Sequence, residues 1–182
     1  SIVRKFVSEG AYVIAVDMMP LTYEIDHVEG HQLNVTDRAA VKSFYEEITK
    51  SKKIHILVNN AGITKDALVQ KMSDDMWDQV IDVNLNGVYN LTKYIGPQMM
   101  DIGNGSIINI ASVVGEFGNV GQSNYAATKS ALYGLSKTWA KEFARKGAAV
   151  RVNTISPGYI MTDILKTVPH ELLDKFAKMT ML

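Results

Sequence analysis

Short apolar runs rich in β-branched residues alternate along this chain with segments of helical periodicity, and this alternation limits the possible folds most strongly. Strands are predicted at residues 11–16, 54–58, 106–111 and 150–156, with a shorter one at 31–33. The runs are largely continuous, which is typical of strands buried on both faces. Helices are expected between them at residues 2–8, 39–50, 74–100 and 124–145. This order predicts an α/β fold with a doubly wound parallel sheet of Rossmann type and right-handed crossovers.

Local capping signals and the chain length fit this organisation. Gly10 and Gly147 each follow a predicted helix and precede a strand, as C-terminal caps do. Asp37 stands just before the helix predicted at residues 39–50, where its side chain can cap the first turn. A chain of 182 residues suits one domain with a sizeable core, so we expect a single domain over residues 1–182.

The composition excludes several classes of function. Nineteen basic residues balance nineteen acidic ones, so no net charge attracts nucleic acid or an anionic membrane. The absence of cysteine removes disulfides, thiolate metal ligands and a thiol nucleophile. No apolar run approaches the roughly 20 residues of a membrane-spanning helix. The four histidines lack the spacing of metal ligands. We therefore expect a cytoplasmic protein that has no metal site and acts on a small molecule.

Polar or glycine-containing residues follow every predicted strand. Asp17 follows the first, Asn34 the short one, residues 59–62 (Asn-Asn-Ala-Gly) the next, Ser112 the next, and Pro157 with Gly158 the last. Ligands of parallel α/β sheets bind outside the carboxyl ends of the strands. Turn chemistry alone would explain any one of these cases, but five together favour a binding site at that edge.

Three residues in the second half of the chain could transfer a proton. Tyr125 and Lys129 are four residues apart, so on a helix they lie on one face. A phenol has an ordinary pKa of about 10, and a neighbouring ammonium would lower that pKa. Ser112, at the end of the strand predicted at residues 106–111, could complete the site. The alternative is an amphipathic helix with a surface lysine and a tyrosine at the edge of the core.

Asp17 indicates which dinucleotide such a site would take. An acid at the end of an early strand accepts hydrogen bonds from ribose hydroxyls in dinucleotide sites, and it would repel a 2′-phosphate. Met18, Met19 and Pro20 follow it and offer no positive charge. We therefore expect NAD rather than NADP, and the alternative is an aspartate that only forms a turn.

Asn84 is a residue of low helix propensity at a predicted helical position. It lies within the helix predicted at residues 74–100, where asparagine and the nearby Gly87 are unfavourable. Asn84 could hold a water on a proton path from Lys129, or it could mark a kink near Gly87.

Two loops offer small residues and hydrogen-bonding groups. Asn60, Ala61 and Gly62 would let a ligand approach the backbone, and the amides could bond ribose or neighbouring strands. After Pro157 and Gly158, the Ile160 backbone and the Thr162 hydroxyl could hold a nicotinamide carboxamide, although Pro-Gly alone is an ordinary turn.

Together these motifs resemble those of the short-chain dehydrogenase/reductase family. The matching segments are residues 59–62, Asn84, Ser112, Tyr125 with Lys129, and Pro157 with Gly158, in the family's order and spacing. Residues 62–66, 72–77 and 112–115 look most like 3-oxoacyl-[acyl-carrier-protein] reductases and acetoacetyl-CoA reductases. The resemblance implies an NAD(P)-dependent oxidoreductase that interconverts a ketone and a secondary alcohol, with a 3-oxoacyl thioester as the best substrate.

The resemblance also implies a role for each residue. Tyr125 would be the general acid in ketone reduction and Lys129 would lower its pKa and bind the nicotinamide ribose. Ser112 would hydrogen-bond the substrate carbonyl, and Asn84 would hold the relay water. Cofactor contacts are expected from Asp17, Asn34, Val35, Asn60, Ala61, Gly62, Tyr125, Lys129, Pro157, Gly158, Ile160 and Thr162. Family members are commonly tetramers, so a homotetramer joined through the helices around residues 86–100 and 124–145 is expected.

Three features depart from the family pattern. Members begin with a strand and a glycine-rich turn whose helix N-terminus binds pyrophosphate, whereas Ser1 is expected to lie inside that helix. Members continue beyond Leu182 with a helix and a strand, so the chain is expected to be incomplete at both ends. Carrier-specific reductases favour NADP and present basic residues to acyl carrier protein. Lys146 suits such a surface, whereas residues 101–104 lack the expected arginine.

Two other functions stay open on the sequence. One is an NAD-dependent dehydrogenase of a small polyol or hydroxy acid. The other is a non-catalytic, cofactor-sensing scaffold, since a fold does not fix a function. The complete set of Asn84, Ser112, Tyr125 and Lys129 argues against the scaffold.

Overall fold

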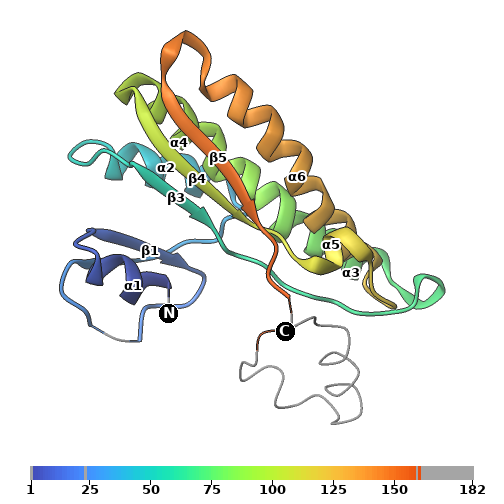
Figure 1. Cartoon of the computed structure of the whole chain (residues 1–182). Helices are drawn as coiled ribbons and strands as arrows, with labels where there is room; N and C mark the ends of the chain where they lie inside the picture. The colour runs from blue at the N-terminus through green and yellow to red at the C-terminus, as the bar shows by residue number, and fades with distance from the viewer. Residues whose placement is uncertain (1, 23, 159, 161–182) are drawn as a thin grey trace.

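The computed structural model describes residues 2–22, 24–158 and 160 (Figure 1). Its helices and strands follow in the order α1 (Ile2–Ser8), β1 (Val13–Asp17), β2 (Val28–Gln32), α2 (Arg38–Ile48), β3 (Ile56–Asn59), η1 (Val69–Lys71), α3 (Asp74–Ile81), η2 (Asp82–Asn86), α4 (Gly87–Ile102), β4 (Asn104–Ile110), α5 (Val113–Phe117), α6 (Ser123–Phe143), η3 (Arg145–Gly147) and β5 (Ala149–Ile155). Every strand pair is parallel, which confirms the predicted α/β class.

The parallel strands form two sheets. β1 pairs with β2, while β3, β4 and β5 pair in that order. Within the part of the chain that the structure describes, no strand joins β1 to β3. The expected sheet is therefore divided at this point.

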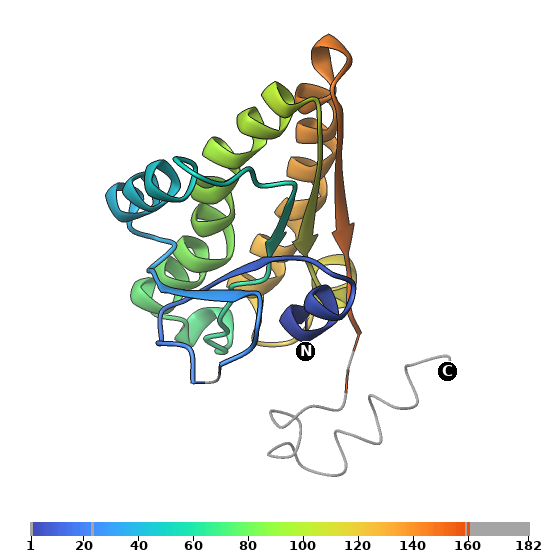
Figure 2. The same cartoon turned by 90° about the vertical axis from the view of Figure 1, so that its left-hand side faces the viewer.

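The helices cover one face of the three-stranded sheet. Figures 1 and 2 show α4 and α6 on the same side of β3, β4 and β5, with α2 beyond α4. The core between them is built from Leu57, Val88, Ile95, Met99, Ile107, Ala111, Leu132, Trp139, Phe143, Val150 and Val152.

The prediction that the strands are buried on both faces is wrong for β5. Val150 and Val152 are buried, whereas Arg151 and Asn153 between them are exposed. Successive side chains of a strand point to opposite faces, and among the described residues helices pack on only one of those faces. β5 therefore alternates as a half-covered strand does.

The helix predicted at residues 74–100 is interrupted, as the sequence suggested near Gly87. α3 ends at Ile81, and the π-helical segment Asp82–Asn86 follows before α4 begins. The N–H of Gly87 bonds the carbonyl of Asp82, five residues back. A Cβ on Gly87 would lie 2.7 Å from Val35 Cγ2, so a glycine is needed for α4 to approach the loop after β2.

The predicted helix caps were confirmed, whereas one predicted strand lies earlier in the chain. The Asp37 side chain accepts the N–H groups of Ala39 and Ala40, each at 3.0 Å, and so caps α2. Gly10 and Gly147 have positive φ values of 84° and 81°, as C-terminal glycines do. The short strand predicted at residues 31–33 lies earlier, at Val28–Gln32. The short helix α5 was not predicted.

Candidate functional site

Three of the predicted clusters meet at the carboxyl edge of the three-stranded sheet. Asn59 pairs with Asn109 in the register of β3 and β4, and Ile110 pairs with Ile155 in β4 and β5. The segments that leave these strands therefore start side by side. The N–H of Val113 donates to the carbonyl of Pro157 at 3.1 Å, which places the Pro157–Gly158 turn next to Ser112.

Ser112 joins this edge to the helix that carries Tyr125. It is the N-cap of α5, and its Oγ accepts the N–H of Val114 at 3.2 Å. α5 packs on α6 through Gly115, because a Cβ there would lie 2.8 Å from the backbone carbon of Lys129. The Ser112 side chain lies near enough to the phenol of Tyr125 to act on its pKa. Two of the three predicted proton-transfer residues are thus close together.

The pKa of Tyr125 is raised above its ordinary value, which contradicts the direction expected from Lys129. Burial of the phenol is the main cause, and the charge of Asp66 adds to it, while the hydrogen bond with Ser112 acts in the opposite sense. The Lys129 ammonium lies 5.5 Å from the centre of the Tyr125 ring. The sequence spacing gave the shared face correctly, but it could not give the degree of burial.

Lys129 is a buried cation. Its side chain is 4% exposed, and Nζ donates to the carbonyl of Ile110 at 2.7 Å. No ion pair with an acidic side chain is formed by this ammonium within residues 2–22, 24–158 and 160. Burial therefore lowers the pKa of Lys129 to about 8.

Asn84 lies in the same cluster, and its side chain holds the loop after β3. Oδ1 accepts the N–H of Ile63 at 2.8 Å and Nδ2 donates to the Ile63 carbonyl at 3.0 Å. A Cβ on Gly62 would lie 3.4 Å from Asn84 Oδ1 and 3.5 Å from Lys129 Nζ. The exposed Gly62 thus lies against both polar groups and has no side chain of its own. An amide and an ammonium beside exposed backbone suit the hydroxyls of a ribose, so this set of donors fits a nicotinamide cofactor.

The structure describes all but one of the remaining residues that the two loops were expected to contribute. Asn60, Ala61 and Gly62 are exposed, so a ligand can reach them. Gly158 is exposed and Ile160 is 61% exposed. Thr162 lies outside the described residues.

Asn59, which begins the Asn-Asn-Ala-Gly motif, is structural. It is buried, and its Nδ2 donates to Thr92 Oγ1 at 3.1 Å and to Asn109 Oδ1 at 2.8 Å. Its amide thus bonds a neighbouring strand, one of the roles that the sequence left open.

Three further residues expected to contact the cofactor lie at the end of β1 or in the loop after β2. Asp17 Oδ1 accepts the N–H of Met19 at 3.0 Å, so the carboxylate does form a turn. Asn34 Oδ1 accepts the N–H and hydroxyl of Thr36, each at 3.0 Å. The carbonyl of buried Val35 accepts from Asn90 Nδ2 at 2.9 Å. This last bond ties the loop after β2 to α4, near the π segment that contains Asn84.

Sequence reasoning missed three polar residues around Tyr125. Asn124, directly before it, is fully buried. Gln122 Nε2 donates to Asp66 Oδ2 at 2.9 Å, which holds the Asp66 charge near the phenol. Asn124 carried a usable signal, because it is a polar residue in the first turn of a helix, where backbone N–H groups need acceptors.

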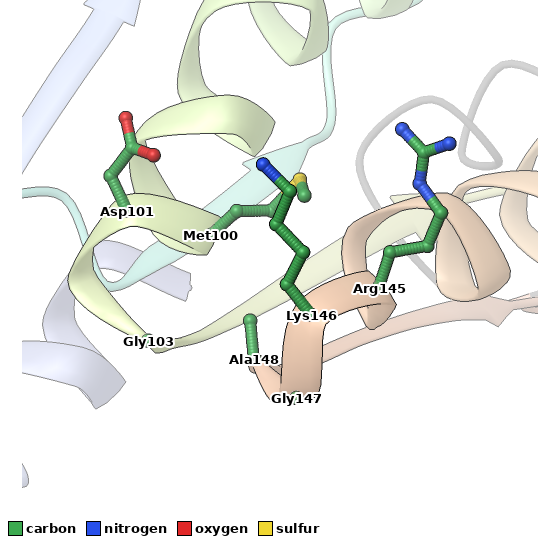
Figure 3. Close-up of a pocket in the computed structure, with 7 residues that line it drawn as sticks. All are labelled: Met100, Asp101, Gly103, Arg145, Lys146, Gly147 and Ala148. Atoms are coloured by element: carbon green, nitrogen blue, oxygen red, sulfur yellow. The ribbon is translucent and has the colours of Figure 1, made fainter.

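A cavity of about 160 Å³ lies at the opposite edge of the sheet. It is lined by Asp101, Arg145 and Lys146, among others, and borders the starts of β4 and β5 (Figure 3). β5 has seven residues, which at about 3.3 Å each span about 20 Å. Lys146, which the sequence suggested as part of a carrier-binding surface, therefore lies at the edge of the sheet opposite to Ser112.

The described residues contain neither a metal-binding cluster nor a membrane-spanning helix. No group of three His, Cys, Asp or Glu side chains among them could hold a metal ion. No helix among them is long and apolar enough to cross a membrane.

Comparison with known proteins gave consistent results. A family model described as short chain dehydrogenase matches residues 1–172. The 3-oxoacyl-[acyl-carrier-protein] reductase of Thermotoga maritima is 46% identical over 176 residues, which cover 91% of this chain and 71% of that protein. The protein of the same name from Staphylococcus epidermidis is 43% identical over 145 residues, which cover 79% of this chain and 59% of that protein.

A solved structure is also similar. A short-chain dehydrogenase from Streptomyces avermitilis matches with a TM-score of 0.82 at 28% identity, over 90% of this chain and 63% of that one. The matched parts therefore make up between 59% and 71% of these three proteins.

Proposed function

We propose that this chain, which belongs to the short-chain dehydrogenase family, interconverts a ketone and a secondary alcohol with a nicotinamide cofactor. The observation that carries the proposal is the buried ammonium of Lys129, 5.5 Å from the centre of the Tyr125 ring, with the Ser112 side chain near the same phenol. A hydroxyl, a phenol and a cation thus lie together at the carboxyl edge of a parallel sheet, where ligands of such folds bind.

The raised pKa of Tyr125 keeps the phenol protonated at neutral pH, although it also makes the phenol a weaker acid. At neutral pH a phenol with a pKa above its ordinary value is protonated, so Tyr125 can give a proton to the oxygen of a ketone as that oxygen gains negative charge. Ser112 Oγ accepts the N–H of Val114, and its hydroxyl hydrogen, which acts on the Tyr125 phenol in the ligand-free protein, could turn to the same ketone oxygen when a ketone binds. The nicotinamide cofactor, when bound, supplies the hydride.

Lys129 and Asn84 would hold the nicotinamide half of the cofactor. Lys129 donates one hydrogen bond to Ile110, and an ammonium has three donors, so it can also bond ribose hydroxyls. Asn84 fixes the backbone of Ile63 and thereby shapes the loop whose Gly62 borders the same space. Asn60, Ala61, Pro157, Gly158 and Ile160 would surround it.

We further propose NAD as the preferred cofactor. The Asp17 carboxylate ends β1, with one oxygen bonded to the turn. Its other oxygen can accept a ribose hydroxyl, and its negative charge opposes a 2′-phosphate. The exposed side chains that follow, Met18 and Met19, supply no cation.

The substrate proposal rests on the similar proteins. Those from Thermotoga maritima and Staphylococcus epidermidis are named for 3-oxoacyl-[acyl-carrier-protein] reduction. We propose a 3-oxoacyl thioester of CoA or of acyl carrier protein, reduced to the 3-hydroxyacyl thioester.

The test is cofactor oxidation by the full-length protein. NADH and NADPH would each be offered with acetoacetyl-CoA, with an acetoacetyl group on acyl carrier protein, and, in the oxidative direction, NAD with a panel of polyols. We expect reduction of the thioester with NADH. A folded protein that oxidises only polyols, or that turns over no substrate with either cofactor, would overturn the proposal.

A further inference from the structure

In the first turn of α6, which carries Tyr125, the acceptor of a backbone N–H is a side chain within the helix and not the N-cap side chain. The N-cap residue Gln122 makes no side-chain cap hydrogen bond. The first N–H groups of a helix have no partner inside the helix. Asn124 Oδ1 instead accepts the N–H of Tyr125 at 2.7 Å. The residue next to the phenol therefore fixes the backbone of Tyr125.

The other end of the same amide reaches two separate segments. Asn124 Nδ2 donates to the carbonyl of Lys65 and to the carbonyl of Met76, each at 3.0 Å. Lys65 lies in the loop after β3, and Met76 lies in α3. Asn124 is 0% exposed, so one buried amide ties the start of α6 to both segments.

The contacts fix the orientation of this amide. The N–H of Tyr125 needs an acceptor, and the two carbonyls need donors. A reversed amide would place its oxygen against two carbonyl oxygens and its NH₂ against an N–H. Both amide hydrogens and the oxygen are therefore used, and aspartate, serine or alanine cannot reproduce the set.

The start of α6 must be held because the site is assembled from different elements. Ser112 comes from the end of β4, whereas Tyr125 and Lys129 come from α6. Two further hydrogen bonds join the loop after β3 to the segment before α6: Gln122 Nε2 to Asp66 Oδ2 at 2.9 Å, and the N–H of Ala67 to the carbonyl of Gly121 at 2.8 Å. A shift of about 1 Å in a reacting group can lower a rate about 100-fold.

We propose that Asn124 is the positioning residue of Tyr125, and that its buried amide keeps the phenol near Ser112. The expected loss of kcat rests on the proposed function, whereas the effect of Asn124 on the position of the phenol does not. Asn124 acts through the backbone of Tyr125 and through the loop and α3 segments. It touches neither substrate nor cofactor in this role.

The kinetic test compares Asn124→Ala and Asn124→Asp with Asn109→Ala. Asn109 is also 0% exposed and donates to Ser136 of the same helix at 2.8 Å, but this bond lies three turns beyond Tyr125. We expect both Asn124 variants to lose about 100-fold in kcat, with KM for NADH changed less than about threefold. Asn109→Ala should lose comparable thermal stability with kcat within about threefold.

A second measurement does not depend on activity. Titration of ¹³C-labelled tyrosine by NMR would follow the phenol of Tyr125, whose other neighbours Asp66, Ser112 and Lys129 are present in every variant. Because burial is the main cause of its raised pKa, Asn124→Ala should move that pKa down towards the ordinary value of about 10. Asn109→Ala should leave it unchanged.

The outcomes separate the two proposals. A wild-type protein that reduces no ketone would overturn the proposed function, and the titration would then decide on Asn124 alone. Unchanged kcat, or a Tyr125 titration that moves no more in the Asn124 variants than in Asn109→Ala, would overturn the positioning role. If Asn124→Ala does not fold, Asn124→Ser keeps an acceptor for the Tyr125 N–H and permits the same comparison.

Discussion

At the scale of single residues, the site contains a charged side chain that is buried away from water. Lys129 is a cation with 4% exposure and no acidic partner within the described part of the chain. Burying an unpaired charge destabilises a fold. The position of Lys129 is therefore better explained by ligand binding than by stability.

Replacing Lys129 should stabilise the ligand-free protein. The folded pKa of about 8 lies below the ordinary 10.5, so the destabilisation is fully present below pH 8 and disappears as the pH rises towards 10.5. We expect Lys129→Met to melt a few degrees higher than the wild type at pH 7, roughly 3–6 °C. The difference should narrow by pH 10.

Thermal unfolding at the two pH values measures this effect. Lys137→Met, which replaces an exposed lysine of the same helix, is the matched control and should change the midpoint little at either pH. A Lys129→Met protein that melts below the wild type at pH 7 would show that the buried ammonium stabilises the fold.

Asp17 provides a test of cofactor choice. Asp17→Asn removes the charge but keeps an oxygen that can accept the N–H of Met19. Without the repulsion of a 2′-phosphate, the ratio of kcat/KM for NADPH to that for NADH should rise about tenfold, which corresponds to about 1.4 kcal/mol. Steady-state kinetics with both cofactors give the ratio, and an unchanged ratio would remove Asp17 from the specificity argument.

At the scale of elements, the sequence predicted what local chemistry determines. The Asp37 cap and the interruption near Gly87 followed from residue types alone. The helix α5 was missed because five residues that include Gly115 carry too short a periodic pattern. The one-sided burial of β5 and the raised pKa of Tyr125 depend on which elements pack where. A spacing of residues in the sequence does not contain that information.

Alanine substitutions of two glycines in neighbouring helices should change the melting temperature in opposite directions. A Cβ on Gly115 would lie 2.8 Å from the backbone carbon of Lys129 and 2.9 Å from the backbone nitrogen of Ser130. Backbone cannot move aside, so Gly115→Ala should push α5 away from α6, lower the melting temperature and separate Ser112 from Tyr125. We expect at least about a tenfold loss of kcat.

Gly134 is the matched control on α6. A Cβ there meets nothing within 4 Å, and alanine is favoured over glycine inside a helix by about 0.5–1 kcal/mol. Gly134→Ala should therefore raise the melting temperature and leave kcat unchanged. Equal behaviour of the two variants would show that the α5–α6 contact does not set the site.

At the scale of the whole molecule, one polar cluster links the two-stranded sheet to the segment before β3. Glu29 of β2 bonds the Tyr12 hydroxyl at 2.7 Å, His31 Nε2 at 2.7 Å and Lys52 Nζ at 2.9 Å. The bonds from Lys52, Tyr12 and His31, in that order of size, lower the pKa of Glu29 to about 2. The cluster should therefore depend on pH.

The folded pKa of Glu29 is depressed, so its contribution to stability is present above the ordinary 4.5 and is lost as the pH falls towards 2. Relative to Glu29→Gln, the wild type should lose stability between pH 4.5 and 2. Its side chain is 30% exposed, so we expect a small effect, about 1 kcal/mol or less, that weakens with salt.

Melting temperatures between pH 7 and 3, at low and high salt, test this expectation. Glu47→Gln on α2 replaces an exposed carboxylate and should follow the wild type at every pH. If the melting temperature of Glu29→Gln runs parallel to that of the wild type down to pH 3, Glu29 does not stabilise the link between the two-stranded sheet and the segment before β3.

The central claim is that Tyr125 donates the proton, and kcat of Tyr125→Phe tests it most directly. Phenylalanine keeps the ring and its packing but removes the hydroxyl that lies near Ser112. Tyr89→Phe, at an exposed tyrosine of α4, is the control. We predict a loss of about 10²–10⁴-fold in kcat for Tyr125→Phe, with the fold intact and the control unaffected. Retained activity in a folded Tyr125→Phe protein would contradict the claim.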